Sequence, residues 1–124
     1  MSCDSRRMTV AEFIAAVSDE AAKHPFIHEV VLLDHTDYAA KLHLIIRSDL
    51  FIQLYANVRL GTRGYTVVHR GQRTYGRDCD AQGWHRHPAA NPESHDVSEE
   101  GRRAVEIAEF LLEVADILEE HELL

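Results

Sequence analysis

Apolar and polar residues alternate along most of the segment from Lys41 to Arg59, and this alternation constrains the fold more than any other feature of the chain. A period of two residues is typical of β-strands that bury one face. A short turn at Ser48 and Asp49 separates the two alternating segments, so the strands on either side must run antiparallel. Three more segments rich in β-branched, aliphatic or aromatic residues complete the pattern. The predicted strands occupy residues 26–33, 41–47, 51–59, 65–70 and 73–78.

A helix is predicted on each side of these strands. Thr9 and Glu12 have the spacing of a capping box, and apolar residues then recur at helical spacing to about Lys23. Ser98 is a good N-cap, which predicts a second helix over 99–120.

The chain is therefore predicted to be a single α+β domain over residues 1–124. Its core is a five-stranded antiparallel meander flanked by an N-terminal and a C-terminal helix. Residues 1–8 are expected to be disordered, and residues 79–97 are expected to form a long loop that carries histidines.

The charge of the chain is unevenly distributed. Its formal net charge of −8 argues against general affinity for nucleic acids. Between Ala56 and Ala90, however, six arginines and two aspartates give that region a net charge of +4, so the remainder carries −12. A local phosphate-binding surface therefore stays compatible with the sequence.

No apolar stretch approaches the roughly 20 residues that a membrane span needs. The N-terminus also lacks the apolar segment of a signal peptide. We expect a cytoplasmic protein that does not contact a membrane.

The predicted loop contains the side chains best suited to catalysis or metal binding. Trp84, His85, Arg86 and His87 are consecutive, and His95 follows within the same loop. Imidazole is the side chain whose ordinary pKa lies nearest neutrality, so several imidazoles on one segment favour proton transfer or metal ligation over packing.

Two chemistries remain open for these histidines, beside a purely structural role for the loop. In general acid–base catalysis on a phosphodiester, two imidazoles transfer protons, and an arginine, Arg86 or Arg77, stabilises the charge that develops on phosphorus. In metal ligation, the three histidines bind zinc and leave a position for water. The spacing matches no strong zinc signature, so we favour catalysis without a metal or other cofactor.

The polar face of the predicted sheet is a candidate surface for RNA. Alternation places Tyr55, Asn57 and Arg59 on that face, and Tyr65, Val67 and His69 are expected to extend it. Aromatic rings stack on bases, which makes Trp84 and Tyr75 further candidates for substrate binding. The alternative is ordinary exposure of one face of an antiparallel sheet to solvent.

Several motifs occur in the order found in one known family. Residues 32–38 (LLDHTDY), 51–57 (FIQLYAN), 71–78 (GQRTYGRD) and 84–88 (WHRHP), with the later His95-Asp96, resemble the TumE family over about residues 26–120. Members of that family are toxin components of type II toxin–antitoxin systems, usually encoded beside a helix-turn-helix antitoxin.

The resemblance implies a toxin, and small toxins of this size often act on RNA. The leading hypothesis is therefore a metal-independent endoribonuclease, whose partners are RNA and a cognate helix-turn-helix antitoxin that covers the basic region or the histidine loop. A homodimer is a further option. The alternatives are a non-catalytic RNA- or metal-binding module and a zinc-dependent hydrolase that uses the same histidines.

Overall fold

The computed structural model describes residues 8–124. The predicted disorder of residues 1–8 falls almost entirely outside this range. Met8 alone is described, and it packs against the hydrophobic core.

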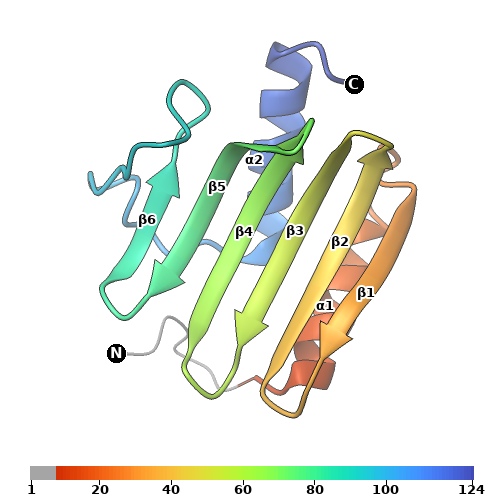
Figure 1. Cartoon of the computed structure of the whole chain (residues 1–124), viewed down its shortest axis with the longest axis vertical. Helices are drawn as coiled ribbons and strands as arrows, with labels where there is room; N and C mark the ends of the chain where they lie inside the picture. The colour runs from red at the N-terminus through yellow and green to blue at the C-terminus, as the bar shows by residue number, and fades with distance from the viewer. Residues whose placement is uncertain (1–7) are drawn as a thin grey trace.

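The strands form one antiparallel sheet in which neighbours in sequence are neighbours in space, as Figure 1 shows. The five predicted strands are all present, which confirms the meander. A sixth strand lies inside the segment predicted to be a loop, so the prediction of five strands was wrong by one. The strands are β1 (Glu29–His35), β2 (Ala39–Arg47), β3 (Leu50–Asn57), β4 (Thr62–His69), β5 (Gln72–Asp80) and β6 (Gly83–His87).

One face of the sheet carries the core. Leu42 lies opposite Leu54, which lies opposite Tyr65, and all three side chains are buried. The predicted inward row of β2 and β3 is thereby confirmed. The prediction that Tyr65, Val67 and His69 face the other side was wrong, because their register partners Leu54, Ile52 and Leu50 are core residues. Because Tyr65 and Val67 are buried, this row of β4 side chains faces the core.

Both helices cover this same face (Figure 1). Helix α1 (Val10–Ala21) begins at the predicted Thr9 capping box and buries Phe13 and Val17. Helix α2 is Ile107–Glu120, eight residues shorter at its start than predicted. The Ser98 hydroxyl does accept a hydrogen bond from the Gly101 amide, but only as part of a turn.

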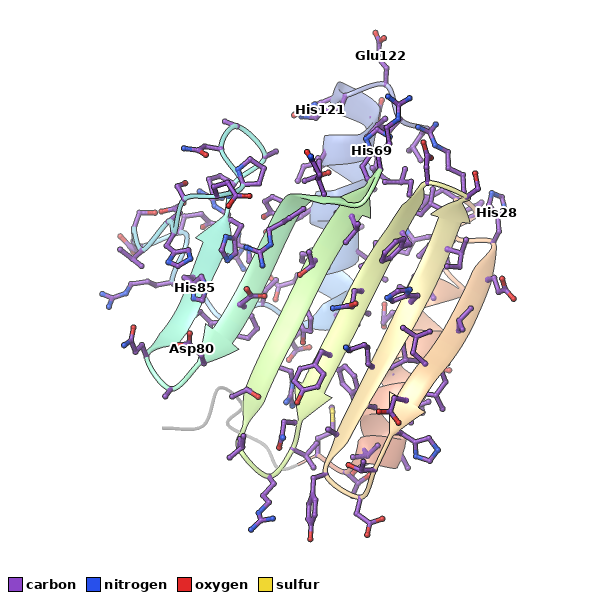
Figure 2. All side chains as sticks on the ribbon, in the orientation of Figure 1. His28, His69, Asp80, His85, His121 and Glu122 are labelled. Carbon is purple, nitrogen blue, oxygen red and sulfur yellow. The ribbon has the colours of Figure 1, made fainter. Side chains whose placement is uncertain are left out.

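The other face of the sheet is free of helices, and we call it the open face. Two rows of residues cross it in register. One row runs through His43, Gln53, Thr66, Gly76 and His87. A second row runs through Lys41, Tyr55, Gly64, Asp78 and His85. Figure 2 shows the polar side chains that project from this face.

No helix within residues 8–124 is long and apolar enough to cross a membrane.

Candidate functional site

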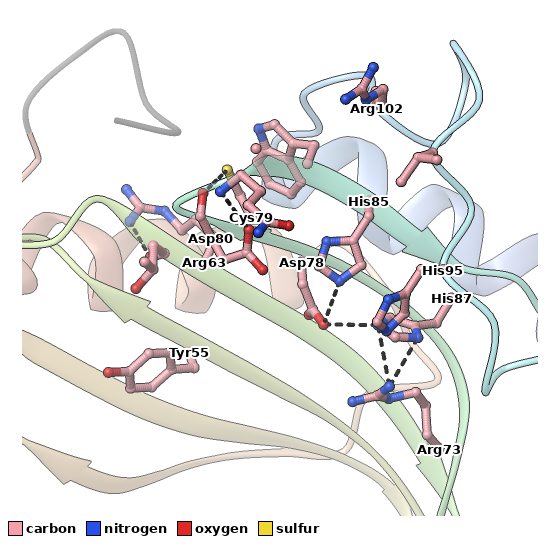
Figure 3. A pocket seen from close by; sticks show the side chains of 15 residues that line it. Tyr55, Arg63, Arg73, Asp78, Cys79, Asp80, His85, His87, His95 and Arg102 are labelled. Carbon is pink, nitrogen blue, oxygen red and sulfur yellow. Dashed lines mark hydrogen bonds and ion pairs between the residues drawn. The ribbon is translucent and has the colours of Figure 1, made fainter. Parts of the chain in front are cut away.

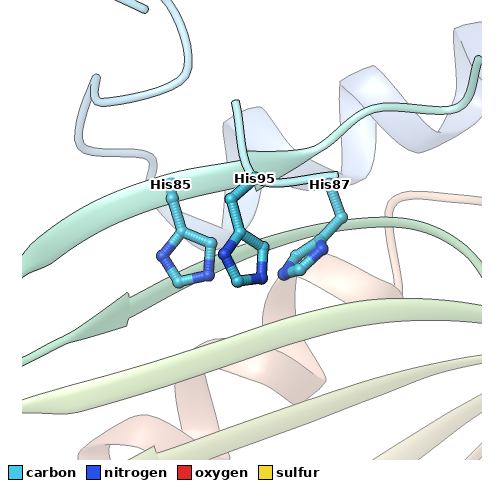
Figure 4. Close-up of side chains that lie close together, drawn as sticks. All are labelled: His85, His87 and His95. Atoms are coloured by element: carbon cyan, nitrogen blue, oxygen red, sulfur yellow. The ribbon is translucent and has the colours of Figure 1, made fainter. Parts of the chain in front are cut away.

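Three imidazoles converge at one edge of the open face (Figure 4). His85 and His87 are two residues apart on β6, so both side chains point to the same face of the sheet. His95 approaches them from the segment that follows. The ring centroids lie 5.0 Å apart for His85 and His87, and 4.9 Å apart for each of them with His95. The structure thus brings together the three histidines that the sequence singled out.

The return of the chain to β6 explains why His95 joins the cluster. The backbones of Arg86 and Asp96 exchange two hydrogen bonds, of 3.1 and 2.8 Å. The Arg86 guanidinium also donates to the Asp96 carboxylate at 2.6 and 2.9 Å. Hydrogen bonds from Ser98, and then from Arg86, lower the pKa of Asp96 to about 2. Arg86 therefore fixes the loop on the face opposite the histidines, and its predicted catalytic role is not supported.

His87 is the most constrained of the three imidazoles. Its side chain is buried, and its Nδ1 lies 2.9 Å from the Pro92 carbonyl oxygen. Because a carbonyl can only accept, the Pro92 contact favours a proton on Nδ1, and Nε2 then faces the Asp78 carboxylate and the Arg73 guanidinium. Burial, followed by the nearby Arg73 charge, lowers the pKa of His87, so its neutral form is favoured at neutral pH.

Two residues that the sequence interpretation missed complete the cluster. The Asp78 carboxylate lies 3.2 Å from Nε2 of His87 and 3.7 Å from Nε2 of His85. The Arg73 guanidinium nitrogen lies 3.0 Å from Nδ1 of His87 and 3.3 Å from its Nε2. Both residues come from β5. Asp78 pairs directly with His85 across the β5–β6 ladder, so recognising β6 as a strand would have placed it here.

A cleft of about 500 Å³ adjoins the cluster (Figure 3). Tyr55, predicted to bind substrate, lines it. Gly64 lies between Tyr55 and Asp78 in the register. A β-carbon on Gly64 would lie 3.6 Å from the Asp78 carboxylate and 3.9 Å from the β-carbon of Tyr55. The absence of a side chain on Gly64 leaves the backbone accessible between these two residues.

Arg77 and Tyr75 do not belong to the site. Both are buried on the helix-covered face, where Arg77 donates to the Glu113 carboxylate at 3.0 and 2.8 Å and to the Glu100 side chain at 2.9 Å. The Tyr75 hydroxyl donates to the same Glu113 carboxylate at 2.8 Å. Burial, followed by the Glu113 hydrogen bond, raises the pKa of Tyr75 to about 12. Their predicted catalytic and substrate-binding roles are replaced by a structural one: they anchor α2 to β5.

We expect Arg77→Met to destabilise the fold by about 3 kcal/mol, because removing one partner of a buried ion pair leaves the other uncompensated. The free energy of unfolding in urea measures this effect. Arg59→Met, at an exposed arginine, is the control and should change it by less than about 0.5 kcal/mol. Equal stability of the two variants would contradict the anchoring role.

The remaining predicted substrate-binding residues lie elsewhere or serve the fold. Trp84 points to the helix side of β6, where its ring lies 5.9 Å from that of Tyr65, although it still contributes to the cleft wall. The Asn57 side-chain oxygen accepts hydrogen bonds from the backbone amides of Arg59 and Leu60, which closes a turn. The Arg59 guanidinium stacks over the Tyr38 ring at 4.9 Å. Neither Asn57 nor Arg59 lines the cleft.

The basic region of the sequence is also less available than its charge suggests. Of its six arginines, Arg70, Arg77 and Arg86 pair with carboxylates. Arg73 alone is positioned at the histidines. Recognition of a phosphate at the imidazoles would therefore depend on Arg73, and Arg63 and Arg102 also line the cleft.

No known family model, curated protein or solved structure matches this chain. The interpretation of the site depends on its own geometry.

Proposed function

We propose that this protein is the toxin of a type II toxin–antitoxin system and that it cleaves RNA without a metal, by histidine acid–base chemistry. The observation that carries the proposal is the convergence of His85, His87 and His95 with Asp78 and Arg73 beside an open cleft. Two imidazoles can act as the acid and the base of a phosphodiester transfer, and a guanidinium can stabilise the charge that develops on phosphorus.

His87 is the general base of this reaction. Its Nε2 takes the proton of a ribose 2′-hydroxyl, and the 2′-oxygen forms a bond to phosphorus as the bond from phosphorus to the 5′-oxygen breaks. A second, protonated imidazole gives its proton to the leaving 5′-oxygen. The products are a 2′,3′-cyclic phosphate and a free 5′-hydroxyl. We assign the acid to His85, which Asp78 orients from 3.7 Å, and place His95 against the phosphate.

Arg73 has two roles in this mechanism. Its guanidinium stabilises the negative charge that develops on the phosphate oxygens. Burial, and then the charge of Arg73, lowers the pKa of His87, which favours the neutral imidazole that can accept a proton. A base with a lowered pKa stays active to lower pH, because it is protonated only in more acidic solution.

We expect Arg73→Gln to move the acidic limb of the kcat/KM profile to higher pH, because removing the guanidinium charge raises the pKa of His87. Initial rates of RNA cleavage between about pH 4 and 9 measure the shift. Arg70→Gln, on the β4–β5 turn, is the charge-matched control. A limb that moves equally in both variants, or in neither, would contradict the assignment of His87 as base.

The RNA strand is proposed to approach over Gly64, with one base stacked on Tyr55. We expect Gly64→Leu to raise KM about 10-fold or more, because its side chain would occupy the accessible backbone beside Asp78. Gly64→Ala is the control, since a single β-carbon makes only ordinary contacts there. Thermal unfolding of both variants separates blocked binding from lost stability, and equal KM values would contradict this path.

A second candidate is a zinc-dependent hydrolase or a metal-binding module. One nitrogen from each of the three histidines lies within 4.8 Å of the others, so small side-chain movements would bring all three to the distance of about 2.1 Å at which imidazole binds zinc. The Arg73 guanidinium next to His87 opposes this reading, because it adds positive charge where a dication would bind.

The proposed function is tested by inducing expression of the wild-type chain in a bacterial host, with growth and RNA integrity followed together. We expect growth arrest with cleaved RNA, reversed by co-expression of a helix-turn-helix protein encoded beside this gene. Growth arrest with intact RNA would overturn the endoribonuclease. Normal growth on induction, together with no RNA cleavage by the purified protein, would contradict the assignment of this chain as a toxin.

A further inference from the structure

The two edges of the sheet differ in how they are protected. The outer edge of β6 is covered, because Asp96 pairs with Arg86 through backbone hydrogen bonds. At the opposite edge, β1 pairs with β2 alone among residues 8–124 (Figure 1). An unpaired edge presents backbone donors and acceptors to any strand that can reach them.

The side chains of β1 make this edge attractive to another strand. Six of its seven residues are exposed. Val30, Leu32 and Leu33 have exposed fractions of 38, 42 and 48 %. Natural edge strands are often protected by lysine, proline or a very short length, all of which β1 lacks; its one bulge lies between Leu32 and Asp34, so residues 29–32 form a regular exposed edge.

We propose that β1 is the interface of a homodimer, in which it pairs antiparallel with β1 of a second copy about a two-fold axis at Val31. The two sheets then form one continuous sheet. A two-fold interface of this kind needs a strand that is complementary to itself. The inference is independent of the proposed function.

The faces of the side chains restrict the position of the axis. Val30 and Leu32 lie opposite Leu44 and Leu42, so both point to the helix-covered side, whereas Val31 lies opposite His43 on the open face. Residues directly opposite each other in an antiparallel pair share a face. An axis at Val31 meets this condition, because it places Val30 of one copy against Leu32 of the other.

An axis one residue further along fails the same condition. It would place Val30 opposite Asp34. The β-bulge between Leu32 and Asp34 turns Asp34 to the open face, opposite Lys41, so the two side chains would point to different sides. The bulge therefore limits the ladder to Glu29–Leu33.

The proposed interface and the histidine cluster lie at opposite edges of the sheet. His28 lies at the sheet edge opposite His85 (Figure 2), so dimerisation leaves the histidine cleft accessible.

A five-residue ladder is a small interface, so we expect a concentration-dependent equilibrium between monomer and dimer. Sedimentation velocity of the full chain, up to about 100 µM, measures it. Val31→Lys places two ammonium groups against each other at the axis and should leave only monomer, with unchanged circular dichroism. A wild-type monomer at every concentration would overturn the proposal, as would a dimer that Val31→Lys does not affect.

Cysteine cross-linking tests the register even if Val31→Lys fails to fold. We expect Val31→Cys to form a disulfide-linked dimer under mild oxidation much faster than Tyr38→Cys, which is 50 % exposed in the β1–β2 turn. The wild-type chain, which has two cysteines of its own, gives the background. Equal rates for the two variants would overturn the axis at Val31. If β1 is protected from hydrogen exchange only after a different protein is added, that protein and not a second copy of the chain pairs with β1, which would overturn the proposal.

Discussion

Replacing His87 with alanine is expected to lower the rate of RNA cleavage by about 10² to 10⁴-fold, which is what a positioned proton transfer contributes. The expectation depends on the position of Nε2, which faces Asp78 and Arg73 while Nδ1 is held by the Pro92 carbonyl. Cleavage of a labelled single-stranded RNA, expressed per folded molecule, measures the loss.

His43→Ala is a matched control for this experiment. His43 is half-buried on the same open face, but it stacks on Phe51 at 4.2 Å and bonds to Gln53 at 3.0 Å, away from the cleft. Because His87 is buried, alanine also removes packing; His87→Gln retains a polar side chain of similar length and separates the two effects. Unchanged cleavage by folded His87→Gln would contradict the assignment of His87 as the base.

The meander was predictable because strand alternation and short connections are features of neighbouring residues in the sequence. Alternation in β2 and β3 is strict, and connections of two to four residues leave only antiparallel pairing. β6 was not predicted, since a five-residue segment with two histidines, an arginine and a following proline has little apolar periodicity. It forms because Gly83, with φ of +100°, allows the tight turn after Asp80.

The start of α2 shows a different limit of sequence reasoning. Ser98 carries a real capping signal, but Arg77 binds both the backbone oxygen and the side chain of Glu100, which holds that turn against the sheet. Glu106 and Glu109 then form a second capping box, and the helix begins there. The pairing of Glu100 with a buried arginine, distant in sequence, accompanies the start of the helix at the second signal and not at Ser98.

The site was predicted only in part, because some of its contacts depend on strand pairing that the sequence did not reveal. The three histidines were recognised because imidazoles are rare and informative wherever they cluster. Arg77 and Arg86 were assigned to catalysis because an arginine near histidines looks the same in sequence whether it faces them or the opposite side. Asp78 and Arg73 were missed because their partners become neighbours only through the β5–β6 pairing.

Chelation separates the two chemistries that this geometry allows. Under the proposed mechanism, cleavage is expected to persist in an excess of a strong chelator, because protons are moved by His87 and His85 alone. Purified protein should then carry far less than one metal per chain. If the three imidazoles hold zinc, chelator should abolish cleavage and metal analysis should give about one zinc per chain.

The control for chelation is a variant that changes the metal site without changing the proposed base and acid. His95→Asn removes one of the three candidate ligand nitrogens and leaves His85 and His87 in place. A zinc site reduced to two histidines should lose its metal and nearly all activity. A proton-transfer site should lose only the contribution of His95 to phosphate binding, seen as a higher KM with a largely retained kcat. Zinc held through purification and lost in His95→Asn together with kcat would overturn the metal-independent mechanism.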